Sequence, residues 1–308
     1  MRVMSLISIL VAGLLAYEPT HAAPQERPTF KAGSELVVLH VSVRDRGRYV
    51  TGLSRDAFTV IDDGKPQTIE MFSADEVPAS VGFLIDNSNS MRPNRDRVIA
   101  SAVAFATHAD PRDEIFVLTF NESVRRAWGP SIVSEMDTGA FRTAMAASIV
   151  ARGMTAIYDG LLAGLAQLEH ARHTRQVLVA VSDGGDNASQ AKLEDALRRV
   201  HESDATVYTV ALVDPLVRDG DRGLLRRLAR ATGGESYEPR GVEDVPDAFA
   251  RIARDIRNAY TLAYAPTAGV DTGERRRRTV RVYVRSPEGR TLSVRTRDGY
   301  FEKREERQ

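Results

Sequence analysis

The sequence predicts an α/β fold, built on a doubly wound and mostly parallel sheet, with a small β domain beside it. Between about residues 78 and 257, four apolar runs alternate with stretches whose apolar residues recur at helical spacing. Before and after that segment, short runs alternate apolar and polar residues, as strands with one covered face do. The chain has 308 residues, which is enough for a substantial core.

The first residues have the pattern of a secretory signal peptide. Arg2 precedes an apolar run that ends near Tyr17, and the small residues Ala22 and Ala23 follow. The run is too short and too interrupted for a membrane span. We therefore expect a signal peptide over 1–22 and a secreted or periplasmic protein, with an uncleaved N-terminal anchor as the alternative. A polar linker then follows over 23–34.

The segments at the two ends of the remaining chain predict β-strands. In the first, 35–77, Asp63-Gly64 signals a hairpin because both residues tolerate positive φ. The second, 258–301, precedes a charged tail at 302–308, and we expect it to pair with the first into one small domain. The expected strands cover 35–44, 58–62, 67–72, 260–264, 278–285 and 291–297.

The central segment, 78–257, predicts the α/β domain. Its apolar runs are apolar on both sides, which indicates strands covered by helices on both faces of a parallel sheet. The expected strands cover 80–85, 115–118, 177–181 and 205–212, and 123–128 could add an edge strand. The expected helices cover 94–108, 156–171, 193–201, 224–231 and 242–257.

Composition excludes several classes of function. Lys plus Arg and Asp plus Glu both number 42, so the whole chain has no electrostatic attraction to nucleic acid. The chain has no cysteine, which rules out thiolate chemistry and cysteine-bound metals. Any metal must therefore take oxygen or imidazole ligands.

Two aspartates follow directly after expected strands of the parallel sheet. Asp86 comes after the first strand, and Asp183 follows Ser182 at the end of the third. Ligands bind outside the carboxyl ends of strands in such sheets, so we expect these carboxylates to lie close together if their strands are neighbours. Two close carboxylates repel each other unless a cation lies between them.

Neutral oxygens surround these carboxylates in the sequence. Ser88 and Ser90 alternate with Asp86, so the three side chains can converge. Thr155 starts an expected helix, where it could either cap the helix or offer its hydroxyl to the same ion. Carboxylate and hydroxyl oxygens suit a small hard cation, so we expect Mg²⁺, with Mn²⁺ or Ca²⁺ as substitutes.

Three motifs together resemble the von Willebrand factor type A domain. Asp86-Asn87-Ser88-Asn89-Ser90 resembles the family's DxSxS loop, Gly153-Met154-Thr155-Ala156 its threonine loop, and Ser182-Asp183-Gly184-Gly185-Asp186 its aspartate loop. The likeness covers about residues 78–257. The flanking segments resemble a bacterial, exported subgroup. One departure is Asn89, where the family usually has glycine, although asparagine tolerates a left-handed backbone.

The resemblance implies a metal-ion-dependent adhesion site. Ser88, Ser90 and Thr155 would ligate the cation directly, and Asp86 and Asp183 would do so directly or through water. An acidic side chain of a partner protein would complete the shell, in an adhesion, scaffolding or assembly role without catalysis. Two alternatives remain: a metal-dependent hydrolase, for which Asp186 and Glu122 are the only loop residues available as a base, and a metal-free structural domain.

Overall fold

The computed structural model describes residues 36–212, 220–267, 276–286 and 288–301. The expected signal peptide, the linker and the charged tail lie outside these residues. Within the described ranges, the longest apolar helices fall short of what is needed to cross a bilayer.

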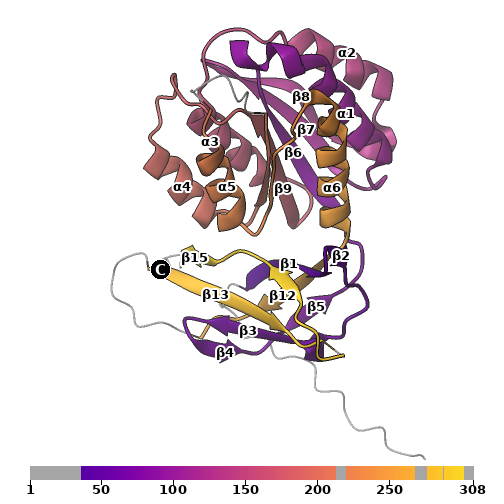
Figure 1. Ribbon diagram of the computed structural model, residues 1–308, viewed down its shortest axis with the longest axis vertical. Coiled ribbons are helices and arrows are strands. Elements are labelled where there is room, and N and C mark those ends of the chain that lie inside the picture. Colours follow the sequence, from indigo (N-terminus) through magenta and orange to yellow (C-terminus); the bar gives the residue numbers. More distant parts are fainter. Residues whose placement is uncertain (1–35, 213–219, 268–275, 287, 302–308) are drawn as a thin grey trace, which may run out of the picture. The chain divides into compact units, whose positions relative to one another are not determined.

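A six-stranded sheet forms the centre of the α/β domain (Figure 1). Its strands run in the order β11-β10-β9-β6-β7-β8, and all neighbours pair in parallel except β7 and β8. The expected doubly wound, mostly parallel sheet is therefore confirmed. The strands are β6 (Ala79–Asp86), β7 (Glu114–Phe120), β8 (Val124–Ile132), β9 (Arg175–Ser182), β10 (Thr206–Ala211) and β11 (Ser236–Tyr237).

Helices cover both faces of this sheet (Figure 1). Alternate residues of β6 point to opposite faces: Phe83 belongs to the core under α1, α2 and α6, and Leu84 to the core under α3, α4 and α5. Gly82 leaves room for the ring of Phe116, because a Cβ there would lie 2.3 Å from it. The helices are α1 (Arg95–His108), α2 (Thr138–Ser148), α3 (Ile157–Leu168), α4 (Leu193–Glu202), α5 (Arg222–Ala231) and α6 (Val245–Arg257).

Strands from the two ends of the described chain pair with each other in the β domain. β1 (Val37–Asp45) pairs with β12 (Ala259–Tyr264), and β3 (Phe58–Asp62) pairs with β13 (Arg277–Val284), both antiparallel. Leu39, Val60 and Tyr264 belong to their shared core. The remaining strands are β2 (Arg48–Tyr49), β4 (Lys65–Gln67), β5 (Met71–Ser73), β14 (Ser293–Arg295) and β15 (Gly299–Phe301).

Several regions differ from the sequence expectation, and the short strands β2, β11 and β15 were not expected. Helix α2 was not expected, because only Phe141 and Met145 of its eleven residues are buried and the apolar period is weak. The strand expected over 67–72 is instead two short strands, β4 and β5. Short 3₁₀ helices also occur at η1 (Arg55–Ala57), η2 (Asn89–Asn94), η3 (Val133–Glu135) and η4 (Val242–Asp244).

A buried carboxylate lies where the last helix leads into the β domain. Asp255, near the end of α6, is 1% exposed. It accepts hydrogen bonds from Ser42 Oγ at 2.9 Å and Tyr208 Oη at 2.6 Å. Arg44 and Arg295 both form ion pairs with it. Burial acts to raise the pKa of Asp255, but the charge of Arg295 and the hydrogen bonds from Tyr208, Arg295 and Ser42 outweigh it and lower the pKa.

Candidate metal site

The first loop of the candidate site starts at the carboxyl end of β6. Asp86 is fully buried, and its Oδ1 accepts a hydrogen bond from the Ser88 backbone N–H at 2.9 Å. This bond turns the chain so that the hydroxyls of Ser88 and Ser90 lie 3.0 Å apart. Ser90 is exposed, whereas Ser88 is buried. The loop therefore presents a carboxylate and two hydroxyls in a row from the interior to the surface.

The position expected to need a left-handed backbone does not need one. Asn89 begins the 3₁₀ helix η2, and it is absent from the described non-glycine residues with positive φ. Its backbone N–H donates to the carbonyl of Gly153 at 3.1 Å. The replacement of the usual glycine therefore leaves the loop intact and joins it to the second loop.

The second loop carries Thr155. Gly153 has φ +93°, and a Cβ there would lie 2.3 Å from the carboxylate of Glu122, so this position requires glycine. Glu122 accepts the Met154 N–H at 2.8 Å, which lowers the pKa of Glu122. The cap residue of α3 is Ala156 rather than Thr155, and it makes no side-chain cap bond. Thr155 is therefore not used as a helix cap.

The third loop follows β9. Ser182 Oγ donates to Asp86 Oδ2 at 2.6 Å, which ties this loop to the first. Asp183 is 8% exposed and accepts the Gly185 N–H through Oδ1 at 3.1 Å. Gly184 has φ +85°, and a Cβ there would lie 2.4 Å from the Asp221 carbonyl oxygen. Glycine thus allows the chain to turn tightly beside Asp183.

Hydrogen bonds join all three loops in pairs. Asn187 Oδ1 accepts the Thr155 N–H at 2.8 Å, and the Asn187 N–H donates to the Thr155 carbonyl at 2.9 Å. These bonds connect the second loop to the third, as Asn89 connects it to the first and Ser182 connects the third to the first. The five expected residues lie on these joined loops. They are Asp86, Ser88, Ser90, Thr155 and Asp183.

Asp86 has no positively charged partner among the residues that the structure describes. Burial is the largest influence and raises its pKa to about 6, against the hydrogen bonds from Ser182 and Ser88. The charge of Asp183 raises it further, which indicates that the two carboxylates are close enough to repel each other. Neither aspartate forms an ion pair with any residue that the structure describes. A cation between them would relieve this repulsion.

The oxygens available for a ligand fit a small hard cation. Among the described residues, neither the Thr155 hydroxyl nor Asp183 Oδ2 has a hydrogen-bond partner, so both keep lone pairs available. No group of three or more His, Cys, Asp or Glu side chains in the described ranges is arranged to hold a metal. The set here has two carboxylates and three hydroxyls, which suits Mg²⁺ or Mn²⁺ better than zinc.

Sequence reasoning missed the residues that hold the loops. Asn87 Oδ1 accepts the backbone N–H groups of Val150 and Ala151 at 2.8 and 2.6 Å, and its Nδ2 donates to Ser148. Asp186 accepts bonds from the Ile157 N–H and from Ser189 Oγ. An asparagine between two motif residues was the only available signal for Asn87, and Asn187 gave no signal of its own.

The fold and these loops define a doubly wound α/β domain with an oxygen-lined site at the carboxyl edge of its sheet. Residues 81–185 match the sequence model of the von Willebrand factor type A domain. The α/β domain is a member of this family. No curated protein matches the chain at the sequence level.

Solved structures agree on the fold. A von Willebrand factor type A protein from Catenulispora acidiphila has a TM-score of 0.51 at 13% identity, over 87% of this chain and 75% of that one. The D319A mutant of the PilB minor pilin from Streptococcus sanguinis has a TM-score of 0.48 at 13% identity, over 60% of this chain and 62% of the pilin. Proximal thread matrix protein 1 from the mussel byssus, with a zinc-occupied MIDAS motif, has a TM-score of 0.48 at 13% identity, over 63% of this chain and 49% of the mussel protein.

Of these three, the Catenulispora acidiphila protein alone has a TM-score above 0.5, and at 13% identity it supports the fold and nothing further. The chain also spans less than two thirds of the length of the pilin and about half that of the mussel protein.

Proposed function

We propose that the domain binds a divalent cation, Mg²⁺ or Mn²⁺, and through it holds an acidic side chain of a partner protein. The observation that supports this most is the pairwise hydrogen bonding of the three loops at one edge of the sheet. Asp86, Ser88, Ser90, Thr155 and Asp183 would hold the ion. Asp86 has no cationic partner among the described residues, which favours a cation from solution.

The domain's own residues prepare the site. Ser182 and the Ser88 N–H orient the Asp86 carboxylate, and Asn187 holds the threonine loop through its backbone. A bound divalent cation would supply a positive centre that attracts a partner's carboxylate. Three of the five ligands would be neutral hydroxyls, so the cation would keep an affinity for a further oxygen ligand such as a carboxylate. Exposed Ser90 marks the side open to a partner.

Apolar residues border the same site. Met154 and Val150 are 51% and 47% exposed, and both belong to the segment between α2 and α3 that carries Thr155. Exposed apolar side chains beside a charged anchor are typical of protein–protein contacts. They support a protein, rather than a free small anion, as the partner. We propose an exported adhesion, scaffolding or assembly role on this basis.

A binding role also fits the two acids that could have served as a base. Glu122 and Asp186 both accept backbone N–H groups that hold the threonine loop and the start of α3. The pKa of Glu122 is lowered, which makes it a weaker base. We therefore propose binding without catalysis.

Titration calorimetry with Mn²⁺ tests the metal site. We expect one site in the wild type, at least a tenfold weaker one in Ser88→Ala, and none in Asp183→Asn. Asp247→Asn is the matched control, because Asp247 is a surface residue of α6 whose one ion pair within the described ranges is with Arg251. Equal heats in wild type and Asp183→Asn would contradict the assignment.

Capture of partners from the exported fraction tests the second half of the proposal. We expect proteins retained with Mg²⁺ to be released by EDTA and to be absent from the Asp183→Asn capture. If the same proteins are retained in EDTA and by Asp183→Asn, a metal-bridged interaction is contradicted, even if the metal itself binds.

A further inference from the structure

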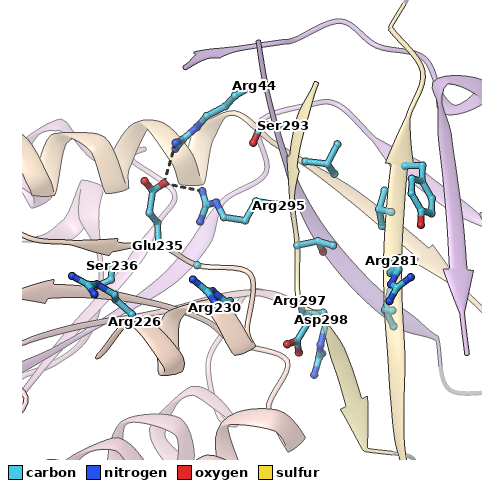
Figure 2. Close-up of a pocket in the computed structure, with 16 residues that line it drawn as sticks. Arg44, Arg226, Arg230, Glu235, Ser236, Arg281, Ser293, Arg295, Arg297 and Asp298 are labelled. Atoms are coloured by element: carbon cyan, nitrogen blue, oxygen red, sulfur yellow. Dashed lines mark ion pairs between the residues drawn. The ribbon is translucent and has the colours of Figure 1, made fainter. Parts of the chain in front are cut away.

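A cleft rich in arginine lies away from the candidate metal site, between α5 with β11 and the strands β13 and β14 (Figure 2). Its volume is about 740 Å³, and a second cavity of about 390 Å³ adjoins it by sharing Arg226, Arg230 and Asp298. Together their lining includes eight arginines and two acidic residues, a formal excess of six positive charges. The arginines are Arg44, Arg226, Arg227, Arg230, Arg277, Arg281, Arg295 and Arg297. Three carboxylates outside the lining, Asp204, Glu238 and Asp255, also pair with these arginines, so the excess falls to three charges in a chain that is neutral as a whole.

Several of these arginines already have partners. Glu235 and Asp255 pair with Arg44 and Arg295, as Figure 2 shows for Glu235. Glu238 pairs with Arg226, Asp204 with Arg297, and Asp298 with Arg277. These guanidinium groups are therefore held in fixed positions and have little charge left to offer.

Three arginines of the lining remain without a partner. The guanidinium groups of Arg227, Arg230 and Arg281 form no ion pair or hydrogen bond with any described residue, and all three side chains are exposed. Arg227 and Arg230 are one turn apart on α5, whereas Arg281 lies across the cleft on β13. Their charge is thus spread along the cleft and does not converge on one point, which suits an extended anion better than a single phosphate group.

The lining also contains polar atoms without a hydrogen bond. Within the described ranges, Ser236 Oγ, Thr296 Oγ1, Arg44 Nε and His201 Nδ1 are shielded from solvent and have no partner. All four residues line one of the two cavities. Four of the six such atoms in the described ranges therefore lie at these cavities, and each costs about 1–3 kcal/mol while it has no partner.

Two edge strands border the cleft. Ser236 belongs to β11 and Ser293 to β14, and each of these strands is the last of its sheet. Edge strands carry backbone N–H and C=O groups outside the sheet's hydrogen-bond ladder, and these can pair with an extended peptide. Tyr283, 56% exposed, adds an aromatic surface to the lining.

We propose that this cleft binds an extended acidic peptide segment of a partner protein, at a site separate from the metal-binding loops. Glutamate or aspartate side chains would pair with Arg230 and Arg281 on opposite walls, because the planar guanidinium group matches a carboxylate. The peptide backbone would meet the edge strands. The cleft does not include Asp86 or Asp183, so a test of peptide binding is independent of the test of the metal site.

Fluorescence anisotropy with a labelled octapeptide of alternating glycine and glutamate tests this, in EDTA and about 50 mM salt so that surface charges are weakly screened. We expect saturable binding by the full protein and at least tenfold weaker binding by the double variant Arg230→Ala, Arg281→Ala. The matched control is Arg55→Ala, Arg142→Ala, which removes one exposed, unpaired arginine from each domain outside the cleft. The control and Asp183→Asn should bind as the wild type does.

Three results with the peptides would overturn the proposal. They are no saturable binding of the glutamate peptide, equal weakening in the two double variants, and equally tight binding of the matched peptide with glutamine in place of glutamate. Displacement by inorganic tripolyphosphate at lower concentration than by unlabelled peptide would also overturn it, because the site would then favour phosphate. Far-UV circular dichroism of each variant separates lost binding from lost folding.

Discussion

Two buried aspartates of this protein have opposite electrostatic surroundings. Asp86, at the metal-binding loops, accepts hydrogen bonds from neutral groups only, and burial raises its pKa to about 6. Asp255, where α6 meets the β domain, pairs with Arg44 and Arg295, and its pKa is lowered. Asp255 therefore has positively charged partners, whereas Asp86 has none among the described residues.

The difference separates a structural carboxylate from a ligand-binding one. Asp62, in the core of the β domain, follows the structural pattern, since Arg278, Tyr264 and Tyr300 all contact its carboxylate. A charge buried without a partner destabilises the folded state and persists only where something compensates for it. For Asp86, a divalent cation from solution is the compensation that we propose.

Replacement of the structural carboxylate should have the largest effect. Asp255→Asn leaves Arg44 and Arg295 with the partly exposed Glu235 as their remaining described counter-charge, so we expect the free energy of unfolding to fall by about 3 kcal/mol. Urea denaturation followed by circular dichroism measures it. Asp247→Asn, which breaks a surface ion pair on the same helix, should cost less than about 0.5 kcal/mol. Similar losses in the two variants would contradict the structural role.

The same replacement at Asp86 should act in the opposite direction. The pKa of Asp86 in the folded protein, about 6, lies above the usual aspartate value of 3.8, so the ionised carboxylate opposes folding at neutral pH. That opposition is absent below about pH 4, where both states are protonated. In EDTA at pH 7, we expect Asp86→Asn to be about 1 kcal/mol more stable than the wild type, since poorer hydrogen bonds with Ser182 offset part of the gain.

If the free energy of unfolding of Asp86→Asn is instead more than about 1 kcal/mol below that of the wild type, Asp86 is a structural carboxylate like Asp255. Repetition at pH 4.5, where the wild-type side chain is largely protonated in the folded state, should reduce the difference between the two proteins. This pH dependence provides an internal control.

His40 gives a smaller, pH-dependent effect in the region of the structural carboxylate. Burial, with the charges of Arg175 and Arg297, lowers its pKa from 6.5 to about 3. As the pH falls below 6.5, the unfolded chain binds a proton that the folded chain excludes, so stability decreases. The wild type should therefore lose free energy of unfolding between pH 6.5 and 5. Because the side chain is only partly shielded, we expect this loss to be about 1 kcal/mol smaller in His40→Gln. Parallel stability–pH curves for the two proteins would contradict this.

The sequence predicted the site loops better than their surroundings. Asp86 directly follows an apolar run and Asp183 follows another after Ser182, so their place at the sheet edge could be predicted from the positions of the expected strands. Helix α2 could not be predicted, because only two of its residues are buried and its apolar period is therefore weak. The Asp255 cluster could not be predicted either, since Ser42 and Asp255 are 213 positions apart and no local pattern marks such a contact.

The effect of Mg²⁺ on stability tests the central claim most directly. In urea denaturation at pH 7, millimolar Mg²⁺ should raise the free energy of unfolding of the wild type by about 1–3 kcal/mol, as a ligand does at 10 to 100 times its Kd. Asp86→Asn should not respond, so the order of stability of the two proteins should reverse on addition of the ion. An equal response of both proteins, or no response of the wild type, would contradict the claim that a divalent cation compensates the buried charge of Asp86.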